Sequence, residues 1–406
     1  MSFEAQLRGL LHQLSSLLNS SVEPSADASA LCQDVRQIIL QPNLSTSARA
    51  ICTDFLLVSQ HPPSLLTFVD RASYQQYAKN KTLANARIET TELIRDYMEQ
   101  YPTSCEFYYG QIQKIFYSVF KRDETSRVRA ATFDIFDHLL SVDGGGVPPP
   151  PATMNMLRVH NVSSGSIVRP FVNCFRRSSQ NLKLSATIRG RSLRLLGKLA
   201  AAYPRHMQDE ASNVLEFCCG ILLKTTGSQM KDTGVETAGS LDGLRYLFRE
   251  FDHLLLEMDA GTRDDLYKVM FRQALTGLKE MKRYQIPEAA LLFVASHGAM
   301  FRHQIVREGL ELFRRICRCF VCKPKRIHQA APGAMKRLLN VLSEHIMSHG
   351  VDSGSGGSSE SGLKESESEK KSMYKMLMSY LEALMCDGSR ATFLVEQAEL
   401  EDGTVS

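Results

Sequence analysis

The sequence has no acidic residue between Gly144 and Gln208, although the whole chain is close to balanced, with 48 Lys and Arg, 44 Asp and Glu and a net charge of +4. The same stretch is rich in cations, namely Arg158, Arg169, Arg176, Arg177, Lys183, Arg189, Arg191, Arg194, Lys198 and Arg205. Because like charges repel, such a segment favours an anionic partner, either the phosphates of a nucleic acid or an acidic face of another protein. The composition of this stretch therefore indicates a surface that binds polyanions.

Other features are missing too, and each absence narrows the class of protein. No uninterrupted apolar run approaches the roughly 20 residues that cross a bilayer. Residues 1–20 are amphipathic rather than a charged stub followed by an apolar core, so we expect no signal peptide and no membrane association. The 10 cysteines show no spacing typical of a disulfide framework, which favours a reducing cytosolic or nuclear compartment.

Strand-like alternation is also missing, whereas helical periodicity runs through the chain. In residues 305–321, apolar side chains recur at steps of one, three and four, which places them on one helical face. The same pattern predicts helices at 7–18, 35–40, 51–58, 88–98, 112–120, 130–140, 188–199, 214–223, 241–248, 266–278, 287–300, 334–346 and 373–384. Successive hairpins at a pitch of about 40 residues are typical of repeats that bury their apolar faces by stacking. We therefore expect an all-α fold, a HEAT/armadillo-like α-solenoid of stacked helical hairpins.

Two segments interrupt this pattern. Residues 143–165 begin with a Gly/Pro-rich loop, and residues 351–371 form a Ser/Gly/Glu-rich tract typical of a disordered linker. We expect N-terminal hairpins at 1–142, basic hairpins at 166–350 and a further helical segment at 372–401, after which the chain ends as an apparent fragment of a larger protein. Four prolines are expected at or near helix boundaries: Pro102, Pro204, Pro287 and Pro332.

A cysteine cluster near the end of the 305–321 helix suggests a metal site as one alternative. Cys317, Cys319 and Cys322 lie close in sequence to His303 and His328. Structural zinc requires four converging ligands, whereas residues two apart on a helix do not share a face. We therefore favour core or surface cysteines over a metal site, and we expect no cofactor.

Catalytic signatures are absent from the sequence. The run from Gly190 to Lys198 has six residues between its glycines and is followed by Leu199, so it does not match a phosphate-binding loop. No Ser/His/acid, Cys/His or paired-carboxylate arrangement has a favourable local context, and His297 is interpreted as a packing residue. We expect no catalytic site within this chain and no small-molecule substrate.

A second basic run extends from Arg302 to Arg337 and contains only Glu308 and Glu311 as acids. Contacts from such runs to a nucleic-acid backbone give affinity without base specificity. The candidate DNA- or partner-binding residues, chosen on charge alone, are Arg176, Arg177, Lys183, Arg189, Arg191, Arg194, Lys198, Arg314, Arg315, Arg318, Lys323, Lys325 and Arg326. A DNA duplex and an acidic protein remain open as partners.

Residues 278–301 contain the string Lys-Arg-Tyr-Gln-Ile-Pro-Glu-Ala, which resembles the Lys-Arg-Tyr-x-x-Pro-x-Ala segment in the N-terminal helical arm of the DNA-dependent protein kinase catalytic subunit family, within the PI3K-related kinases. Further segments resemble that arm in the same order: 55–59, 66–69, 115–123, 195–204 and 374–382. The two interrupting segments look like insertions relative to the family.

The resemblance implies a HEAT-like arm that helps to hold double-stranded DNA ends and the Ku heterodimer during non-homologous end joining in the nucleus. The serine/threonine kinase domain of the family lies far beyond this region, and the arm has no short motif whose residues can be carried over. A generic HEAT-repeat scaffold that binds proteins without direct DNA contact is the alternative.

Overall fold

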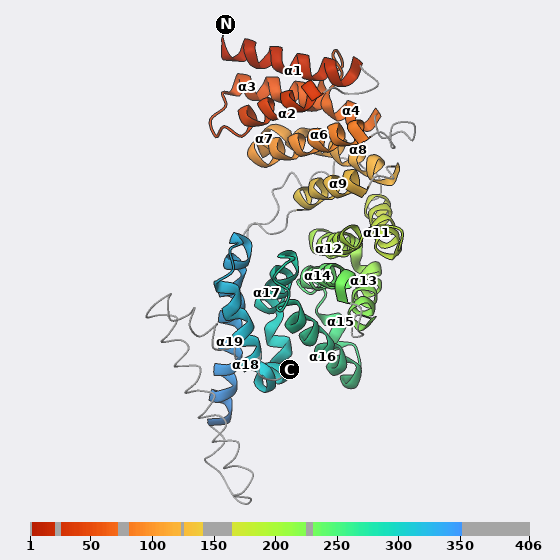
Figure 1. Cartoon of the computed structure of the whole chain (residues 1–406). Helices are drawn as coiled ribbons and strands as arrows, with labels where there is room; N and C mark the ends of the chain where they lie inside the picture. The colour runs from red at the N-terminus through yellow and green to blue at the C-terminus, as the bar shows by residue number, and fades with distance from the viewer. Residues whose placement is uncertain are drawn as a thin grey trace, which may run out of the picture. The chain divides into compact units, whose positions relative to one another are not determined.

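The computed structural model describes residues 2–20, 26–71, 81–122, 126–140, 165–224 and 230–350, and their regular structure is helical (Figure 1). No β-strand forms within these ranges, where a single isolated bridge joins Gln60 and Pro63. The expected all-α class is therefore confirmed. No helix in the described part is both long enough and apolar enough to cross a lipid bilayer.

The chain divides into two compact units, Met1–Ala211 and Ser212–Ser406, here called the N-terminal and C-terminal units. The boundary falls inside α13 (Pro204–Lys224). The helices between residue 165 and this boundary therefore belong with those that precede the Gly/Pro-rich segment. Residues 143–164, 351–371 and 372–401, for which we expected a loop, a linker and a helix, lie outside the described residues.

The N-terminal unit contains mostly short and medium-length helices. They are α1 (Phe3–Ser20), α2 (Ala26–Ile39), α3 (Thr46–Thr53), the π-helical turn η1 (Asp54–Val58), α4 (Leu65–Arg71), α6 (Lys81–Gln100), α7 (Pro102–Cys105), the 3₁₀ turn η2 (Glu106–Tyr108), α8 (Tyr109–Arg122), α9 (Ser126–Leu139), α11 (Gly165–Gln180) and α12 (Ala186–Ala202). Pro102 and Pro204 each begin a helix, where a missing N–H costs least, as expected.

The helices of the N-terminal unit pack as successive neighbours. The helix α1 contacts α2, α2 contacts α6, α6 contacts α9, and α9 contacts α12, which together form one row. The helices α4 and α8 contact each other and also contact α6 and α9 respectively, so they lie beside this row. Figure 1 shows these helices stacked from α1 to α9. Helices that are separated by a whole hairpin in the sequence, such as α2 and α6, are therefore direct neighbours in this row.

An aromatic cluster joins α8, α9 and α11 in this unit. The ring centroids of Phe120 and Phe133 are 4.8 Å apart, those of Phe136 and Phe171 are 5.4 Å apart, and those of Phe136 and Phe175 are 5.7 Å apart. All five rings are buried, with Phe175 at 0% exposure. Edge-on and tilted contacts of this kind stabilise a core beyond the burial of their area. They fix α11 against α9 in spite of the long sequence gap between the two helices.

The C-terminal unit is organised around α17. Its elements are α14 (Met230–Leu247), α15 (His253–Leu256), α16 (Ala260–Gly277), α17 (Gln285–His297), the 3₁₀ turn η3 (Gly298–Phe301), α18 (Arg302–Phe320) and α19 (Lys325–Gly350). The helix α17 contacts α14, α16 and α19, and it buries Ile286, Leu291, Phe293 and Val294. The α17 part of the segment that carries the family resemblance therefore contributes to the core, whereas the Lys-Arg-Tyr string before it does not.

Small residues allow the neighbours of α17 to approach closely. A Cβ added at Gly277 of α16 would lie 3.3 Å from the Cβ of Ala290, and one added at Gly333 of α19 would lie 3.3 Å from the Cβ of Ala295. Both distances are tighter than ordinary van der Waals contact. The alanines and glycines at these positions thus set the spacing between α17 and the helices on either side of it.

Pro332 departs from the sequence expectation. It lies inside α19, so the expected helix boundary at this residue is wrong. A proline inside a helix removes one backbone hydrogen bond and costs about 3 kcal/mol. The helix continues because its apolar face is buried on both sides of the proline, with Ala331 and Ala334 at 0% exposure.

Candidate functional site

The helix α12 carries cations from the centre of the acid-free stretch. Its N-terminus is capped by Ser185, whose hydroxyl accepts a hydrogen bond from the backbone N–H of Ile188 at 3.4 Å. Arg191, Arg194 and Lys198 follow at steps of three and four, which puts them on one face of the helix. That face meets α9, the neighbour of α12 in the row of helices.

Two carboxylates of α9 face these cations. The Nη1 atom of Arg191 lies 2.8 Å from Oδ1 of Asp134. The Nη2 atom of Arg194 lies 3.2 Å from Oδ2 of Asp137, and Nζ of Lys198 lies 2.8 Å from Oδ1 of the same aspartate. Lys198 is buried, with 2% exposure. Acidic residues that precede the acid-free stretch in sequence therefore face its central cations within the fold.

The ion pairs continue along the row of helices. Arg95 of α6 lies 3.6 Å from Oδ2 of Asp134 through Nη1 and 2.7 Å from Oδ1 of Asp96 through Nη2. Arg36 of α2 lies 2.5 Å from Oδ2 of Asp96 through Nε. We call this set the ion ladder; it comprises Arg36, Asp96, Arg95, Asp134, Arg191, Arg194, Asp137 and Lys198. It links α2, α6, α9 and α12, in the order in which these helices pack.

Sequence reasoning did not single out Asp134 and Asp137. They lie in a different segment from the cations, and the sequence gives no pairing between α9 and α12. One feature of the sequence is consistent with the pairing: the two aspartates are three residues apart, which is also the spacing of Arg191 and Arg194. Matching spacing on two helices permits parallel ion pairs once the helices are known to be neighbours.

Arg176 and Arg189 are held by contacts close to them in sequence. The Nη2 atom of Arg176 donates to Oδ1 of Asn173 at 3.2 Å. The guanidinium of Arg189 donates to the backbone carbonyl of Leu184. Both side chains are partly buried; the first contact lies within α11, and the second joins α12 to the residue before its N-cap.

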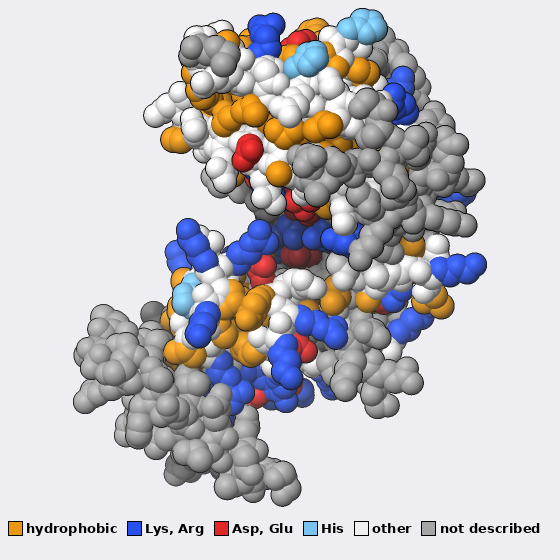
Figure 2. Space-filling model, turned by 45° about the horizontal axis from the view of Figure 1, so that its top comes forward, with side chains coloured by type: hydrophobic (Ala, Val, Ile, Leu, Met, Phe, Trp, Pro, Cys, Tyr) orange, Lys and Arg blue, Asp and Glu red, His pale blue; other side chains and the backbone are white. Residues whose placement is uncertain are grey.

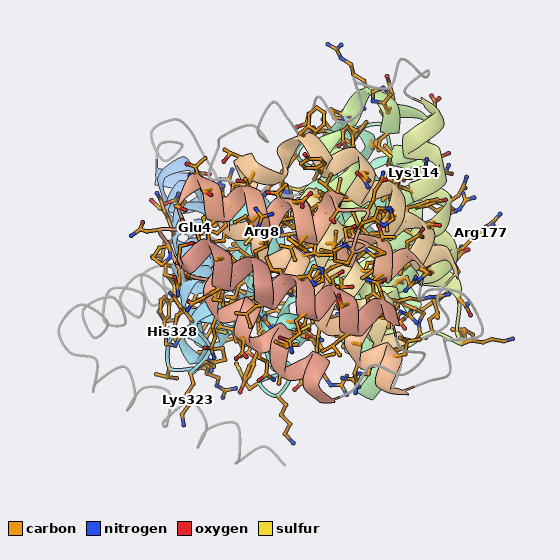
Figure 3. All side chains as sticks on the ribbon, turned by 90° about the horizontal axis from the view of Figure 1, so that it is seen from above. Glu4, Arg8, Lys114, Arg177, Lys323 and His328 are labelled. Carbon is orange, nitrogen blue, oxygen red and sulfur yellow. The ribbon has the colours of Figure 1, made fainter. Side chains whose placement is uncertain are left out.

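The α11–α12 corner, formed by Arg177, Leu182 and Lys183, presents the exposed part of the first basic run. Arg177 and Lys183 are exposed, and Leu182 is 85% exposed. Figure 3 shows Arg177 directed away from the ribbon, on the same side of the view as Lys114 of α8. This corner is the part of the acid-free stretch whose candidate cations reach furthest into solvent.

In the second basic run, Arg315 is buried at 7% exposure. Its guanidinium lies against the carboxylate of Glu311 one turn earlier on α18 and donates to the backbone carbonyl of Leu275 on α16. Arg315 thus fastens α18 to α16. The flanking candidates Arg314 and Arg318 are partly buried.

The exposed candidates of the second run are Lys323, Lys325 and Arg326, at the turn between α18 and α19. Figure 3 shows Lys323 and His328 at the periphery of this unit. Figure 2 shows Lys and Arg side chains spread over the lower part of the viewed face, with apolar side chains between them. The second run therefore divides into a buried part that holds helices together and an exposed part at a helix turn.

The three clustered cysteines lie at the end of α18. Burial raises the pKa of Cys317 and Cys319 to about 12, so both thiols keep their protons at neutral pH. The thiol of Cys322 donates to Sδ of Met281 at 3.4 Å. In the part of the chain that the structure describes, no group of three or more His, Cys, Asp or Glu side chains is placed to hold a metal ion.

His297 is part of the packing of the C-terminal unit. Its Nε2–H donates to the backbone carbonyl of Arg245 at 2.9 Å, and its ring lies edge-on to Phe248, with centroids 5.6 Å apart. Burial lowers the pKa of His297, assisted by the nearby Arg245. The ring lies on α17 and is held by the carbonyl of Arg245 on α14 and by Phe248, as expected for a packing residue.

The described residues define a helical protein: the helices of the N-terminal unit pack as successive neighbours, and the exposed cations of both basic runs lie at or beside helix turns. Comparison with known proteins gives the family. The family description "DNA-PKcs, N-terminal" matches residues 55–352, and the chain therefore belongs to this family. The matched range includes the Lys-Arg-Tyr segment on which the resemblance was first based, and the predicted family is confirmed.

Curated relatives with the name "DNA-dependent protein kinase catalytic subunit" match most of the chain at low identity. The mouse protein is 22% identical over 338 residues, which cover 83% of this chain and 8% of the relative. The Dictyostelium discoideum protein is 23% identical over 295 residues, covering 70% of this chain and 6% of the relative. The Xenopus laevis protein is 23% identical over 290 residues, covering 71% and 6%. The chain thus spans less than a tenth of the length of these relatives.

Proposed function

We propose that this chain acts as a non-catalytic N-terminal scaffold arm of a DNA-dependent protein kinase catalytic subunit. In this proposal its hairpins form a HEAT-like α-solenoid that contributes to binding DNA ends and the Ku heterodimer. The process served is the repair of double-strand breaks by non-homologous end joining in the nucleus. The family assignment supports this proposal, together with helices that pack as successive neighbours.

The observation that carries the DNA-binding part is the α11–α12 corner. Arg177 and Lys183 are exposed within a stretch that contains no carboxylate between residues 144 and 208. The cations on the α9-facing side of α12 already meet Asp134 and Asp137, whereas Arg177 and Lys183 project into solvent. A phosphate backbone is attracted to such exposed cations without any base readout.

The test measures fluorescence anisotropy of a labelled blunt duplex against the chain across a salt series. The variant Arg177→Glu/Lys183→Glu is expected to weaken binding and to lower the salt slope by about 2, since each phosphate contact contributes about 0.9. The ion-ladder arginines are unsuitable for this test. Arg191→Glu would place a carboxylate against Asp134 and would change stability together with binding.

The matched control is Arg8→Glu/Arg272→Glu, which reverses the charge of two other exposed arginines, on α1 and α16. It is expected to retain the salt slope of the unaltered chain. Equal losses in both double variants would show only a general charge effect and would overturn the proposed surface. The same assay with duplex carrying bound Ku tests whether this corner contributes when the heterodimer is present.

A generic HEAT-repeat scaffold that binds proteins without direct DNA contact is the second candidate. The ion ladder favours it, because much of the basic character detected in the sequence is neutralised within the fold. Absence of salt-dependent duplex binding, both with and without Ku, would leave this candidate in place of the DNA-binding arm.

A further inference from the structure

Two turns of the C-terminal unit lie side by side at one end of its helices. Residues 278–284 connect α16 to α17, and residues 321–324 connect α18 to α19. The thiol of Cys322 in the second turn contacts Sδ of Met281 in the first at 3.4 Å. On the same two hairpins, Arg315 of α18 donates to the carbonyl of Leu275 on α16. Side chains from both turns therefore form one surface.

This turn surface is strongly basic. Its residues are Lys279, Lys282, Arg283, Tyr284, Val321, Lys323, Lys325 and Arg326. The one acidic residue within the two turns is Glu280, whose carboxylate accepts a hydrogen bond from the backbone N–H of Lys282 at 2.9 Å. One oxygen of that carboxylate is thus hydrogen-bonded within its own turn, and positive charge exceeds negative charge on the surface.

The turn surface also exposes apolar side chains among its cations. Tyr284 is 50% exposed and Val321 is 45% exposed, although most large apolar side chains of this unit are buried. Tyr284 follows Met281 by three residues, and Val321 directly precedes Cys322, so each lies next to the contact between the turns. Exposed apolar groups close to a rim of charge are typical of protein interfaces.

We propose that the turn surface binds an acidic peptide segment of a partner protein, one that carries an aromatic or aliphatic anchor. The carboxylates of that segment pair with the lysines and arginines, and its anchor packs on Tyr284 and Val321. Charge complementarity selects an acidic partner. The apolar groups select a protein rather than a duplex, because a phosphate backbone offers nothing for Val321 to contact. This site is separate from the α11–α12 corner, and its occupancy does not depend on duplex binding.

Single-stranded nucleic acid fits the surface less well. Sites for single strands use successive aromatic side chains on which bases stack. Tyr284 is the one aromatic side chain in the two turns, and the neighbouring Val321 and Met281 provide no ring face. An oligothymidylate therefore serves as a competing probe in the test.

The experiment measures fluorescence polarisation of labelled glutamate-rich peptides against the full 406-residue chain. One peptide carries a single phenylalanine, and a second has alanine in its place. Tyr284→Ala is expected to weaken the phenylalanine peptide about tenfold and to change the alanine peptide little, since only the first loses an aromatic contact. The variant Lys323→Glu/Lys325→Glu/Arg326→Glu is expected to weaken both peptides.

A control variant, a second test variant and a check of folding accompany this measurement. Arg8→Glu/Lys114→Glu reverses two exposed cations of the N-terminal unit and is expected to leave peptide affinity unchanged. Val321→Ser repeats the Tyr284 test at the second apolar position, and circular dichroism confirms that each variant remains helical.

The proposal is overturned if the phenylalanine peptide shows no saturable binding, or if Tyr284→Ala and Val321→Ser bind it as the unaltered chain does. It is also overturned if oligothymidylate binds through the same residues more tightly than the peptide does. Arg177→Glu/Lys183→Glu, assayed in parallel, separates this result from failure of duplex binding, because that variant alters only the α11–α12 corner.

Discussion

Lys198 meets Asp137 through two different atoms of the aspartate. Its ammonium lies 2.8 Å from the carboxylate Oδ1 and donates to the backbone carbonyl at 3.2 Å. The lysine side chain is only 3% exposed, whereas that of the aspartate is 35% exposed. A buried ammonium needs such partners, because burying an unpaired charge costs several kcal/mol. The contact therefore binds α12 to α9 at the end of the ion ladder.

Asp137→Ala is expected to lower the free energy of unfolding of the N-terminal unit by about 2 kcal/mol. Breaking a buried pair removes the carboxylate from the ammonium of Lys198, and the solvent exposure of the aspartate moderates the cost. Lys198→Met is expected to cost less, because it removes the buried charge and keeps much of the side-chain volume. Urea denaturation with peptide-resolved hydrogen exchange over α9 and α12 measures both changes.

Asp34→Ala, at an exposed carboxylate of the same unit, is the matched control and is expected to change stability by no more than about 0.5 kcal/mol. If Asp137→Ala were as mild as this control, or milder than Lys198→Met, the buried ion pair would have no structural importance.

The ion ladder also shows which part of the fold the sequence could predict. Periodicity depends on neighbours within one turn or two, so it located α1, α6, α12 and α18, with ends that differ by several residues. The partner of Lys198 is 61 residues away, and that of Arg191 is 57 residues away. Pairings at such separations depend on which helices pack together, and periodicity within each helix does not specify this.

The sequence likewise predicted the candidate binding surface only in part. Charge alone selected Arg177 and Lys183, which the fold exposes, and equally Lys198 and Arg315, which it buries. The sequence does not distinguish these pairs, because exposure depends on tertiary packing. In the sequence, Tyr284 is part of the segment that resembles the family, but its place beside the α18–α19 turn follows only from the contact between Met281 and Cys322.

Gly298→Ala is expected to destabilise the C-terminal unit by about 1 to 2 kcal/mol, although alanine favours helix more than glycine does. An added Cβ would lie 2.7 Å from Cγ of Arg337, whose guanidinium donates to the carbonyl of Ala295 at 3.1 Å. Relieving the clash requires Arg337 to move and weakens this hydrogen bond between α19 and α17. The free energy of unfolding in urea gives the magnitude.

Gly220→Ala is the matched substitution in the same unit. Apart from the backbone of its own helix and its chain neighbours, no atom lies within 4 Å of the added Cβ. The change in helix propensity therefore acts alone and is expected to stabilise α13 by about 0.5 to 1 kcal/mol. Opposite signs for the two substitutions would support close packing at Gly298. Stabilisation by both would contradict it.

Acidification is expected to destabilise the C-terminal unit partly through His297. Burial lowers its pKa in the folded state, and the guanidiniums of Arg245, Arg249 and Arg337 lower it further, against a raising effect of the hydrogen bond to the Arg245 carbonyl. As pH falls through the ordinary histidine pKa of about 6.5, the unfolded chain takes up the proton first. Stability is therefore full above that value and decreases below it, until the folded-state pKa is reached.

His297→Gln tests this because glutamine retains an N–H donor for the Arg245 carbonyl but cannot take up a proton. Between about pH 7 and about pH 5, a range that brackets the ordinary histidine pKa, the variant is expected to lose less stability than the unaltered chain in urea denaturation. His138 of α9, whose pKa burial also lowers, contributes in both proteins and cancels in the comparison. The exposed His328 provides the control substitution His328→Gln, which should leave the pH dependence intact. An identical pH dependence in His297→Gln and the unaltered chain would mean that His297 takes up its proton as readily in the fold as in the unfolded chain.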